Sequence, residues 1–177
     1  MTDLPDPAEA EARLLAFLDG LGVRWTRHAH PPVFTVEEAR AHCAHLPGVH
    51  CKNLFLVEKS GAPWLVTLRD DRRLRIPDIA RAAGAPRLSF GKPDALARRL
   101  GVAPGSVTPL ALLHDRDRAV RFVIDAALLS AEIFNCHPLH NAATLAMFPG
   151  DLRRFLAATG HDPVVLDVDA LERAEGR

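Results

Sequence analysis

The pattern of apolar and polar positions is clearest at residues 51–57, where Cys51, Lys52 and Asn53 precede a run of apolar side chains. The run ends at a turn signal, Glu58-Lys59-Ser60-Gly61. This arrangement is typical of a buried strand. It predicts a core strand with the charged head of Lys52 at its mouth, and a hairpin partner at residues 63–68.

Apolar residues at helical spacing, together with capping residues, predict five helices. The first follows the capping residue Asp6, and the second opens with a capping box formed by Thr35 and Glu38. Each of the three later helices ends at a glycine, a common C-terminal helix signal. The predicted helices span residues 7–20, 35–42, 77–83, 93–100 and about 151–159.

Short or alternating apolar runs predict further strands. Those at residues 120–125 alternate cleanly, which indicates one buried face. Hairpin-joined strands with irregularly interspersed helices favour an α+β fold with a mixed sheet. At this length we expect a single domain at 1–177, with its core at about 9–168. The additional predicted strands are 24–28, 87–90, 120–125, 133–137, 144–147 and 163–168.

The distribution of charged residues adds one local feature to the predicted fold. The chain has 22 basic and 22 acidic residues, so the whole molecule does not attract a polyanion. Residues 69–99 differ, because nine basic side chains there stand against four acidic ones. This segment is either a basic binding face or an ordinary solvated surface.

Cysteine usage and the N-terminus bear on the compartment. Three cysteines, an odd number, argue against a disulfide framework and favour a reducing cytosol. Residues 1–7 are acidic and lack an apolar signal core. No run approaches the ~18 apolar residues needed to span a bilayer. We therefore expect a cytoplasmic protein with no membrane partner.

Residues 42–51 contain three histidines and two cysteines, which makes zinc the first candidate ligand. The paired C-x-x-C or H-x-x-x-H spacing of zinc sites is missing. We expect no metal and no other cofactor.

Cys51 and Cys136 are candidate nucleophiles, because each adjoins a residue that can carry positive charge. Neighbours along a strand point to opposite faces, however, so they are poorly placed to act together. A cysteine-dependent hydrolase remains an alternative.

Three other features suggest a site. Lys52 is one of three lysines against nineteen arginines, although a strand-end lysine can simply keep its head in water. The loop at 101–109 has two Gly and two Pro, and such a loop directs backbone amides that can hold a carbonyl or an oxyanion. A rigid connector is its alternative role. Residues 137–141 end a strand in a polar turn with two imidazoles and a carboxamide.

Taken together, five stretches resemble one family. In chain order they are similar to the YbaK/prolyl-tRNA-synthetase-associated editing domains, and in particular to the freestanding bacterial prolyl-tRNA editing proteins that deacylate alanyl-tRNA(Pro). The resemblance covers about residues 9–160 and implies a barrel-like, mostly antiparallel sheet with surrounding helices. The stretches are residues 32–38, 52–56, 88–91, 105–109 and 137–141.

The resemblance assigns roles to individual residues. Lys52 would be the catalytic residue, Asn53 would help to place the 3′-terminal adenosine, and His137 would line the aminoacyl pocket. His140 departs from the pattern, since relatives more often carry threonine there, and leaves the finer shape of the pocket open. The substrate's own ribose hydroxyl would assist as the base. Backbone amides that hold the aminoacyl carbonyl would come from Gly105, Ser106, Val107, Thr108 and Pro109.

The implied substrate is tRNA(Pro) carrying alanine. A synthetase pocket made for proline cannot strongly reject alanine, because missing methylenes are worth only ~1–3 kcal/mol. A second site that admits alanine and excludes proline corrects the error. Arg72 and Arg81 are the expected phosphate contacts, and prolyl-tRNA synthetase or an elongation factor is an expected transient partner. The alternative is a catalytically silent relative that binds aminoacyl-tRNA or regulates a synthetase.

Overall fold

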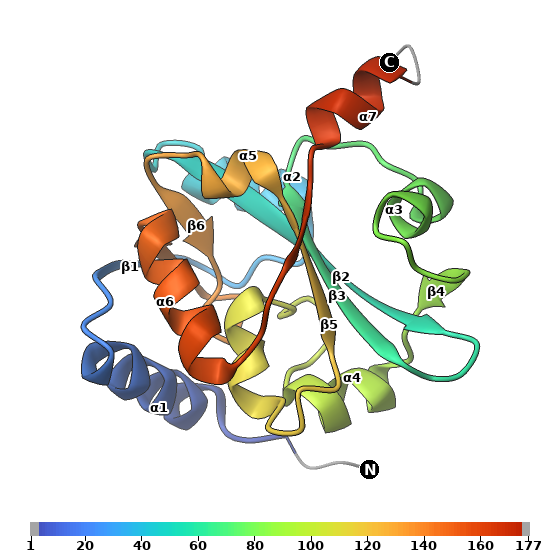
Figure 1. Ribbon diagram of the computed structural model, residues 1–177. Helices are drawn as coiled ribbons and strands as arrows, with labels where there is room; N and C mark the ends of the chain where they lie inside the picture. The colour runs from blue at the N-terminus through green and yellow to red at the C-terminus, as the bar shows by residue number, and fades with distance from the viewer. Residues whose placement is uncertain (1–3, 175–177) are drawn as a thin grey trace.

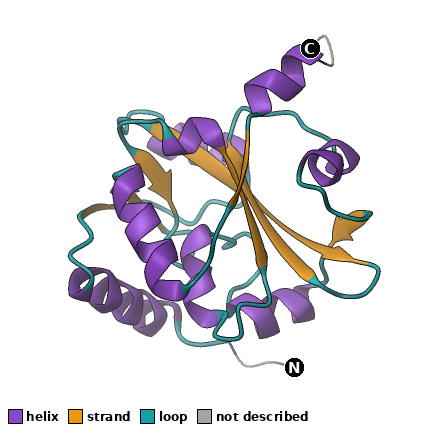
Figure 2. Cartoon of the chain, in the orientation of Figure 1, coloured by secondary structure: helices purple, strands orange, loops and turns teal. Residues whose placement is uncertain are grey.

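The computed structural model describes residues 4–174, in which helices lie on both sides of a twisted sheet (Figures 1 and 2). The helices are α1 (Pro7–Gly20), α2 (Val36–Cys43), α3 (Ile76–Ala82), α4 (Pro93–Leu100), the 3₁₀ helix η1 (Pro109–His114), α5 (Ala126–Leu129), α6 (Pro149–Thr159) and α7 (Val168–Ala174). The strands are β1 (Trp25–Ala29), β2 (Val49–Glu58), β3 (Pro63–Arg69), β4 (Leu88–Phe90), β5 (Arg121–Asp125), β6 (Phe134–Cys136), β7 (Ala143–Met147) and β8 (Val164–Leu166).

Both N-terminal capping patterns form as the sequence predicts. The carboxylate of Asp6 accepts hydrogen bonds from two amides at the start of α1, at 2.9 and 3.2 Å. At the start of α2, Thr35 Oγ1 accepts from the amide of Glu38 at 3.1 Å, and the Glu38 carboxylate accepts from the amide of Thr35 at 3.3 Å. These bonds satisfy amides that have no acceptor within the helix.

The described strands form one mixed sheet in the order β1-β7-β6-β2-β3-β5-β8, and β4 adds to β2. Four pairings are antiparallel (β1 with β7, β6 with β7, β2 with β3, β2 with β4) and three are parallel (β2 with β6, β3 with β5, β5 with β8). The α+β class and the antiparallel majority are confirmed. The sheet is strongly bent but does not close, because β1 and β8 lie at the two ends of this order.

Two apolar clusters cover opposite faces of the sheet. The larger cluster packs α1, α4, η1 and α6 against one face, and the edge-to-face contact of Phe17 with Phe155 joins α1 to α6 at 6.1 Å between ring centroids. The smaller cluster packs α3 against the other face, and Figure 1 shows α3 on the side opposite α1 and α6. Phe122 of β5 belongs to the first cluster and Val123 to the second, so the predicted single buried face of this strand is wrong.

Three short helices were not predicted from the sequence: η1, α5 and α7. α5 is a single turn that begins where the buried carboxylate of Asp125 accepts from the amide of Ala127 at 3.0 Å. η1 begins at Pro109, the last residue of the predicted loop. α7 begins at Val168, the last residue of the strand predicted at 163–168.

Gly48, at the entrance to β2, is the position where we expect the largest effect of a single added methyl group. Its φ is +95°, and a Cβ there would lie 2.5 Å from the carbonyl oxygen of Ile133, which precedes β6. Gly61 has a similar φ of +88° with nothing within 4 Å of the added atom. Gly61→Ala should therefore cost about 1–2 kcal/mol for the left-handed backbone alone, whereas Gly48→Ala adds a backbone clash.

Chemical denaturation of both variants measures the difference directly. We expect Gly48→Ala to lose roughly 2 kcal/mol more than Gly61→Ala, which is within the usual range for overpacking. Equal losses would show that the close approach of β2 and β6 is not a firm constraint.

Candidate active site

A surface cavity beside β2 brings together several residues that the sequence singled out. It has about 560 Å³ of empty space, including its opening to solvent. Its wall includes Lys52 and Asn53 of β2, Gly105 and Val107 of the loop before η1, and His137, which follows β6. The rest of its wall is formed by Val33, Phe34, Thr35, Ala39 and Cys51.

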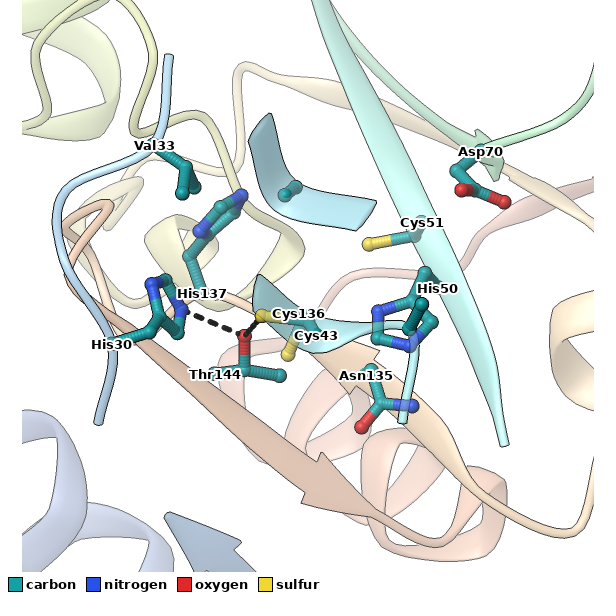
Figure 3. A pocket seen from close by; sticks show the side chains of 12 residues that line it. His30, Val33, Cys43, His50, Cys51, Asp70, Asn135, Cys136, His137 and Thr144 are labelled. Atoms are coloured by element: carbon teal, nitrogen blue, oxygen red, sulfur yellow. Dashed lines mark hydrogen bonds between the residues drawn. The ribbon is translucent and has the colours of Figure 1, made fainter. Parts of the chain in front are cut away.

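A second cavity adjoins the first and lies deeper between β2, β6 and α2. The two share four wall residues and the inner one has about 510 Å³ of empty space, again including its opening. Figure 3 shows imidazoles and thiols gathered around it, with Thr144 Oγ1 bridging His30 Nε2 at 3.1 Å and the Cys43 sulfur at 3.7 Å. The shared residues are Val33, Ala39, Cys51 and His137.

Lys52 does not lie at the mouth of its strand, as the sequence suggested. β2 begins at Val49, so Lys52 is an interior, half-buried strand residue that pairs with Leu68 of β3. Its ammonium donates a hydrogen bond to the backbone carbonyl of Arg72 in the turn after β3. The lysine is therefore a positioned cation.

Asn53 is oriented by a residue that the sequence did not point to. Thr67, its register partner on β3, is fully buried and donates its hydroxyl to Asn53 Oδ1 at 2.8 Å. The Asn53 amide group also contacts the sulfur of Cys51, with Nδ2 at 3.6 Å. Cys51 and Asn53 share one face of the pleated strand, whereas Lys52 lies on the alternate face. In the sequence, the only sign of this contact is that Thr67 is a polar residue within the apolar strand predicted at 63–68.

The loop before η1 only partly fits its predicted role. Gly105 and Val107 line the cavity, and the positive φ of Gly105, +85°, turns the backbone there. The amide of Ser106 donates to the Ala103 carbonyl at 3.0 Å, so it is not available to a substrate. Of the predicted loop positions, Gly105 and Val107 are therefore the two that border the cavity of Lys52.

Thr108 and Pro109 are buried and start η1 instead. Thr108 Oγ1 donates to the backbone carbonyl of His137 at 2.8 Å. This bond ties the loop to the residue that separates the two cavities. The predicted role of these two residues as carbonyl holders is replaced by a structural one.

His137 is neutral at physiological pH. Burial, with a smaller effect from the nearby imidazoles of His30, His140 and His50, lowers the pKa of its imidazole to about 4. Its Nδ1 is buried and has no hydrogen-bond partner among residues 4–174, and the same holds for Oδ1 of Asn135. Asn135 Nδ2 donates to the Pro47 carbonyl at 2.9 Å, which leaves Oδ1 of this cavity-lining residue as an unused acceptor among the described residues.

The thiols near the site are protonated. Burial raises the pKa of Cys51 to about 12 and raises that of Cys136 well above its usual value. A thiol is nucleophilic only as the thiolate, and nearby charge does not produce one here. The geometry therefore gives no support to the cysteine-dependent alternative.

The described residues do not form a cluster of metal ligands. Within residues 4–174, no group of three or more His, Cys, Asp or Glu side chains is arranged to hold a metal ion. The histidines and cysteines of residues 42–51 diverge instead, since Cys43 and Cys51 reach the inner cavity while His42 and His45 are exposed.

Arg72 is not a surface cation, so the expectation that it contacts tRNA phosphate is wrong. Its side chain is 4% exposed and its guanidinium forms ion pairs with Asp125 at 2.9 Å, Asp169 at 2.7 Å and Glu172 at 3.0 Å. The high cost of desolvating a charge keeps such a group with its partners. Arg81 of α3 fits the expectation better, because its side chain is 67% exposed, although it pairs with the buried carboxylate of Asp78 at 3.2 Å.

His140 has a structural role outside the cavity of Lys52. Its Nδ1 accepts from the amide of Ala142 at 3.1 Å, and its Nε2 donates to Glu11 of α1 at 3.1 Å. Glu11 also pairs with Arg27 of β1 at 2.6 Å. These bonds anchor α1 to the turn that follows His137.

Comparison with known sequences gives these cavities a context. A sequence model described as the aminoacyl-tRNA editing domain matches residues 30–155, a range that contains both cavities. This chain belongs to the aminoacyl-tRNA editing domain family. The resemblance seen in the sequence is therefore confirmed.

Two relatives show how far the similarity of this editing domain extends. The prolyl-tRNA synthetase associated domain-containing protein 1 of Danio rerio is 42% identical over 165 residues, which cover 92% of this chain and 90% of that protein. The prolyl-tRNA editing protein ProX of Acetoanaerobium sticklandii is 30% identical over 154 residues, 86% of this chain and 94% of that protein.

Solved structures confirm the fold of the editing domain. The hypothetical protein APE2540 superposes with a TM-score of 0.67 at 25% identity, covering 86% of this chain and 96% of its own. A candidate trans-editing enzyme for prolyl-tRNA synthetase superposes with a TM-score of 0.68 at 22% identity, covering 93% and 98%. In the part of the editing domain that the structure describes, no helix has the length and apolar composition needed to cross a membrane.

The pKa of His137 makes a testable prediction about stability. The folded pKa of about 4 lies below the unfolded value of about 6.5, so the unfolded chain binds more protons between these pH values. Stability should therefore fall as the pH is lowered from about 6.5 to about 4, by up to about 3 kcal/mol from this residue.

Urea denaturation across this pH range, with wild type and His137→Gln compared, isolates the effect. His137→Gln should flatten the slope in this window, whereas the control His45→Gln, at an exposed histidine, should keep it. The same slope in all three proteins would contradict the buried, neutral state of His137.

Proposed function

We propose that this protein is a trans-editing deacylase that hydrolyses the ester of alanine mischarged onto tRNA(Pro). The observation that carries the proposal is the convergence of Lys52, Asn53 and His137 on one cavity, within the residues that match the editing domain family. The names of the similar proteins, one a prolyl-tRNA editing protein and one a prolyl-tRNA synthetase associated domain protein, favour prolyl-tRNA as the substrate class.

In the proposed complex, Lys52 supplies positive charge where negative charge develops during ester hydrolysis. Among the described residues that line its cavity, none is Asp or Glu, so the ammonium is the dominant charge there. A fixed charge in a partly desolvated site stabilises an oxyanion far more than it would in water. The backbone at Gly105 and Val107 borders the same space and adds amide dipoles to the hold on the carbonyl.

The substrate itself supplies the base in this mechanism. The wall of the Lys52 cavity has no carboxylate, whereas Asp70 lies on the wall of the inner cavity, and His137 faces both cavities as a neutral imidazole. A ribose hydroxyl next to the ester is already positioned to orient the attacking water, which needs neither a metal nor a thiolate. Asn53, held by Thr67, places the terminal adenosine.

The inner cavity would receive the amino acid. Its wall is largely apolar and carries two buried polar atoms, Asn135 Oδ1 and His137 Nδ1, that can bond an α-amino group. In this proposal the amino-acid methyl group lies on the side of the wall formed by Val33 and Cys43, and the added methylenes of a pyrrolidine ring would crowd that wall. Overpacking of this kind costs about 1–3 kcal/mol, enough to favour alanine over proline as the substrate.

Substitution of Lys52 tests the proposed chemistry. Lys52→Ala should reduce release of alanine from charged tRNA(Pro) by about 100-fold or more, the usual effect of removing one oxyanion-stabilising group. Lys52→Arg should restore little, because a planar guanidinium does not replace a compact ammonium. Release of radiolabelled alanine under single-turnover conditions is the measurement.

The exposed Lys59 provides the matched control. Lys59→Ala should deacylate as wild type does, and the melting temperature of each variant shows whether it is folded. A folded Lys52→Ala protein with near-native activity would rule out this mechanism and would require a different hydrolytic mechanism.

The acceptor stem of the tRNA is proposed to lie across the exposed part of segment 69–99, with Arg81 as one phosphate contact. Neutralising one contact should weaken binding and reduce the slope of log K against log salt by about 0.7–0.9. Arg13 on α1 is a matched control, because it is similarly exposed and also pairs with an acid of its own helix.

Affinity for tRNA at several salt concentrations compares Arg81→Gln with Arg13→Gln. We expect the smaller slope only for Arg81→Gln, with little change in the rate at saturating substrate. If both variants retain the wild-type slope, the tRNA lies on a different surface.

A further inference from the structure

The Lys52 ammonium and the Arg72 carbonyl meet although they belong to different elements. Arg72 lies in the turn directly after β3, and the last residues of β3 pair with Cys51 and Lys52 of β2. The sheet register thus brings this turn next to the lysine. The position of the carbonyl then depends on how firmly the turn is held.

The Arg72 side chain holds the same turn through contacts with β5 and α7. Its Nε donates to Asp125 Oδ2 at 2.9 Å, and this fully buried carboxylate also accepts from the Arg69 amide at 3.4 Å. Its Nη1 lies 2.7 Å from Asp169 and 3.0 Å from Glu172, both on α7. One guanidinium therefore joins the turn to β5 and to the C-terminal helix.

These contacts act together because the guanidinium is buried. Charge-assisted bonds in a fixed fork geometry orient the group that makes them. Removing some of its carboxylates leaves a buried charge with too few partners, and the turn must move to hydrate it. Asp169 and Glu172 lie beyond residues 30–155, the part of the chain that matches the family model.

We propose that Arg72 is a positioning residue for Lys52, and that α7 acts through it: Asp169 and Glu172 hold the guanidinium, and the turn presents its carbonyl to the ammonium. The carbonyl holds the flexible lysine at one edge of the cavity. This inference rests on the proposed function, since it treats Lys52 as the catalytic group.

A labelling experiment tests the positioning without any tRNA. The chain has three lysines, and Lys59 and Lys92 are exposed, so trace acetylation followed by mass spectrometry reports Lys52 against two internal references. In the double variant Asp169→Asn/Glu172→Gln, Lys52 should react several-fold faster relative to Lys59 and Lys92. The charge-preserving pair Asp169→Glu/Glu172→Asp should stay close to wild type.

Asp151→Asn is the control for a general loss of stability. Asp151 is a buried acid of α6 that pairs with Arg154 at 2.9 Å, away from both cavities. Its loss should lower the melting temperature and leave the relative labelling of Lys52 unchanged. Increased labelling in this control as well would mean that general loosening, not the α7 contact, exposes the lysine.

Kinetics complete the test. The double variant should lower kcat for alanyl-tRNA(Pro) roughly 10-fold, since small misplacement of a catalytic group has effects of this size or larger, and KM should stay within about twofold because the phosphate contacts are untouched. Unchanged labelling, an unchanged kcat, or a raised kcat in the folded double variant would overturn the inference. Failure of the proposed function is seen separately, as retained activity of Lys52→Ala.

Discussion

The pairing of β2 with three neighbours is the constraint on which both the fold and the site depend. β6 pairs with its first residues in parallel, β3 pairs with it along most of its length, and β4 pairs with its last residues. A strand held on both sides cannot slip by one residue without moving every side chain to the other face. The register of His50 with Asn135 therefore fixes how Cys51, Lys52 and His137 lie around one opening.

The charge states of the side chains around this opening depend on which of them are buried away from water. Burial keeps His137 neutral and the thiols of Cys51 and Cys136 protonated, because each would be charged only at a cost when buried. Lys52 instead stays within reach of the Arg72 carbonyl and of open solvent. The cavity thus combines one positioned cation with uncharged neighbours, an arrangement suited to a reaction in which the substrate gains negative charge and provides its own base.

Local signals in the sequence predicted most of the elements, because capping residues, turn glycines and apolar runs act over a few residues. What they could not predict are the contacts that only the fold creates. Arg72 is separated in sequence by 53 and 100 residues from Asp125 and Glu172, so a basic segment read as surface became a buried ion-pair centre. The support of Asn53 by Thr67 was hidden for the same reason, since nothing in the sequence shows which strands pair. The family resemblance identified Lys52, Asn53 and His137, and in the structure all three line one cavity. The resemblance also assigned Ser106, Thr108 and Pro109 to the site, but these loop residues do not line that cavity.

The measurement that tests the central claim most directly is single-turnover hydrolysis by the wild-type protein of tRNA(Pro) charged in parallel with alanine, serine or proline. The account predicts rapid release of alanine and release of proline at about 10-fold to 100-fold lower rate, the discrimination that a few kcal/mol of packing provides. Serine adds one hydroxyl group to alanine, so its rate of release shows whether the inner cavity accepts a side chain of intermediate size. Equal rates for alanine and proline, or no release above the spontaneous rate from any of the three, would contradict it.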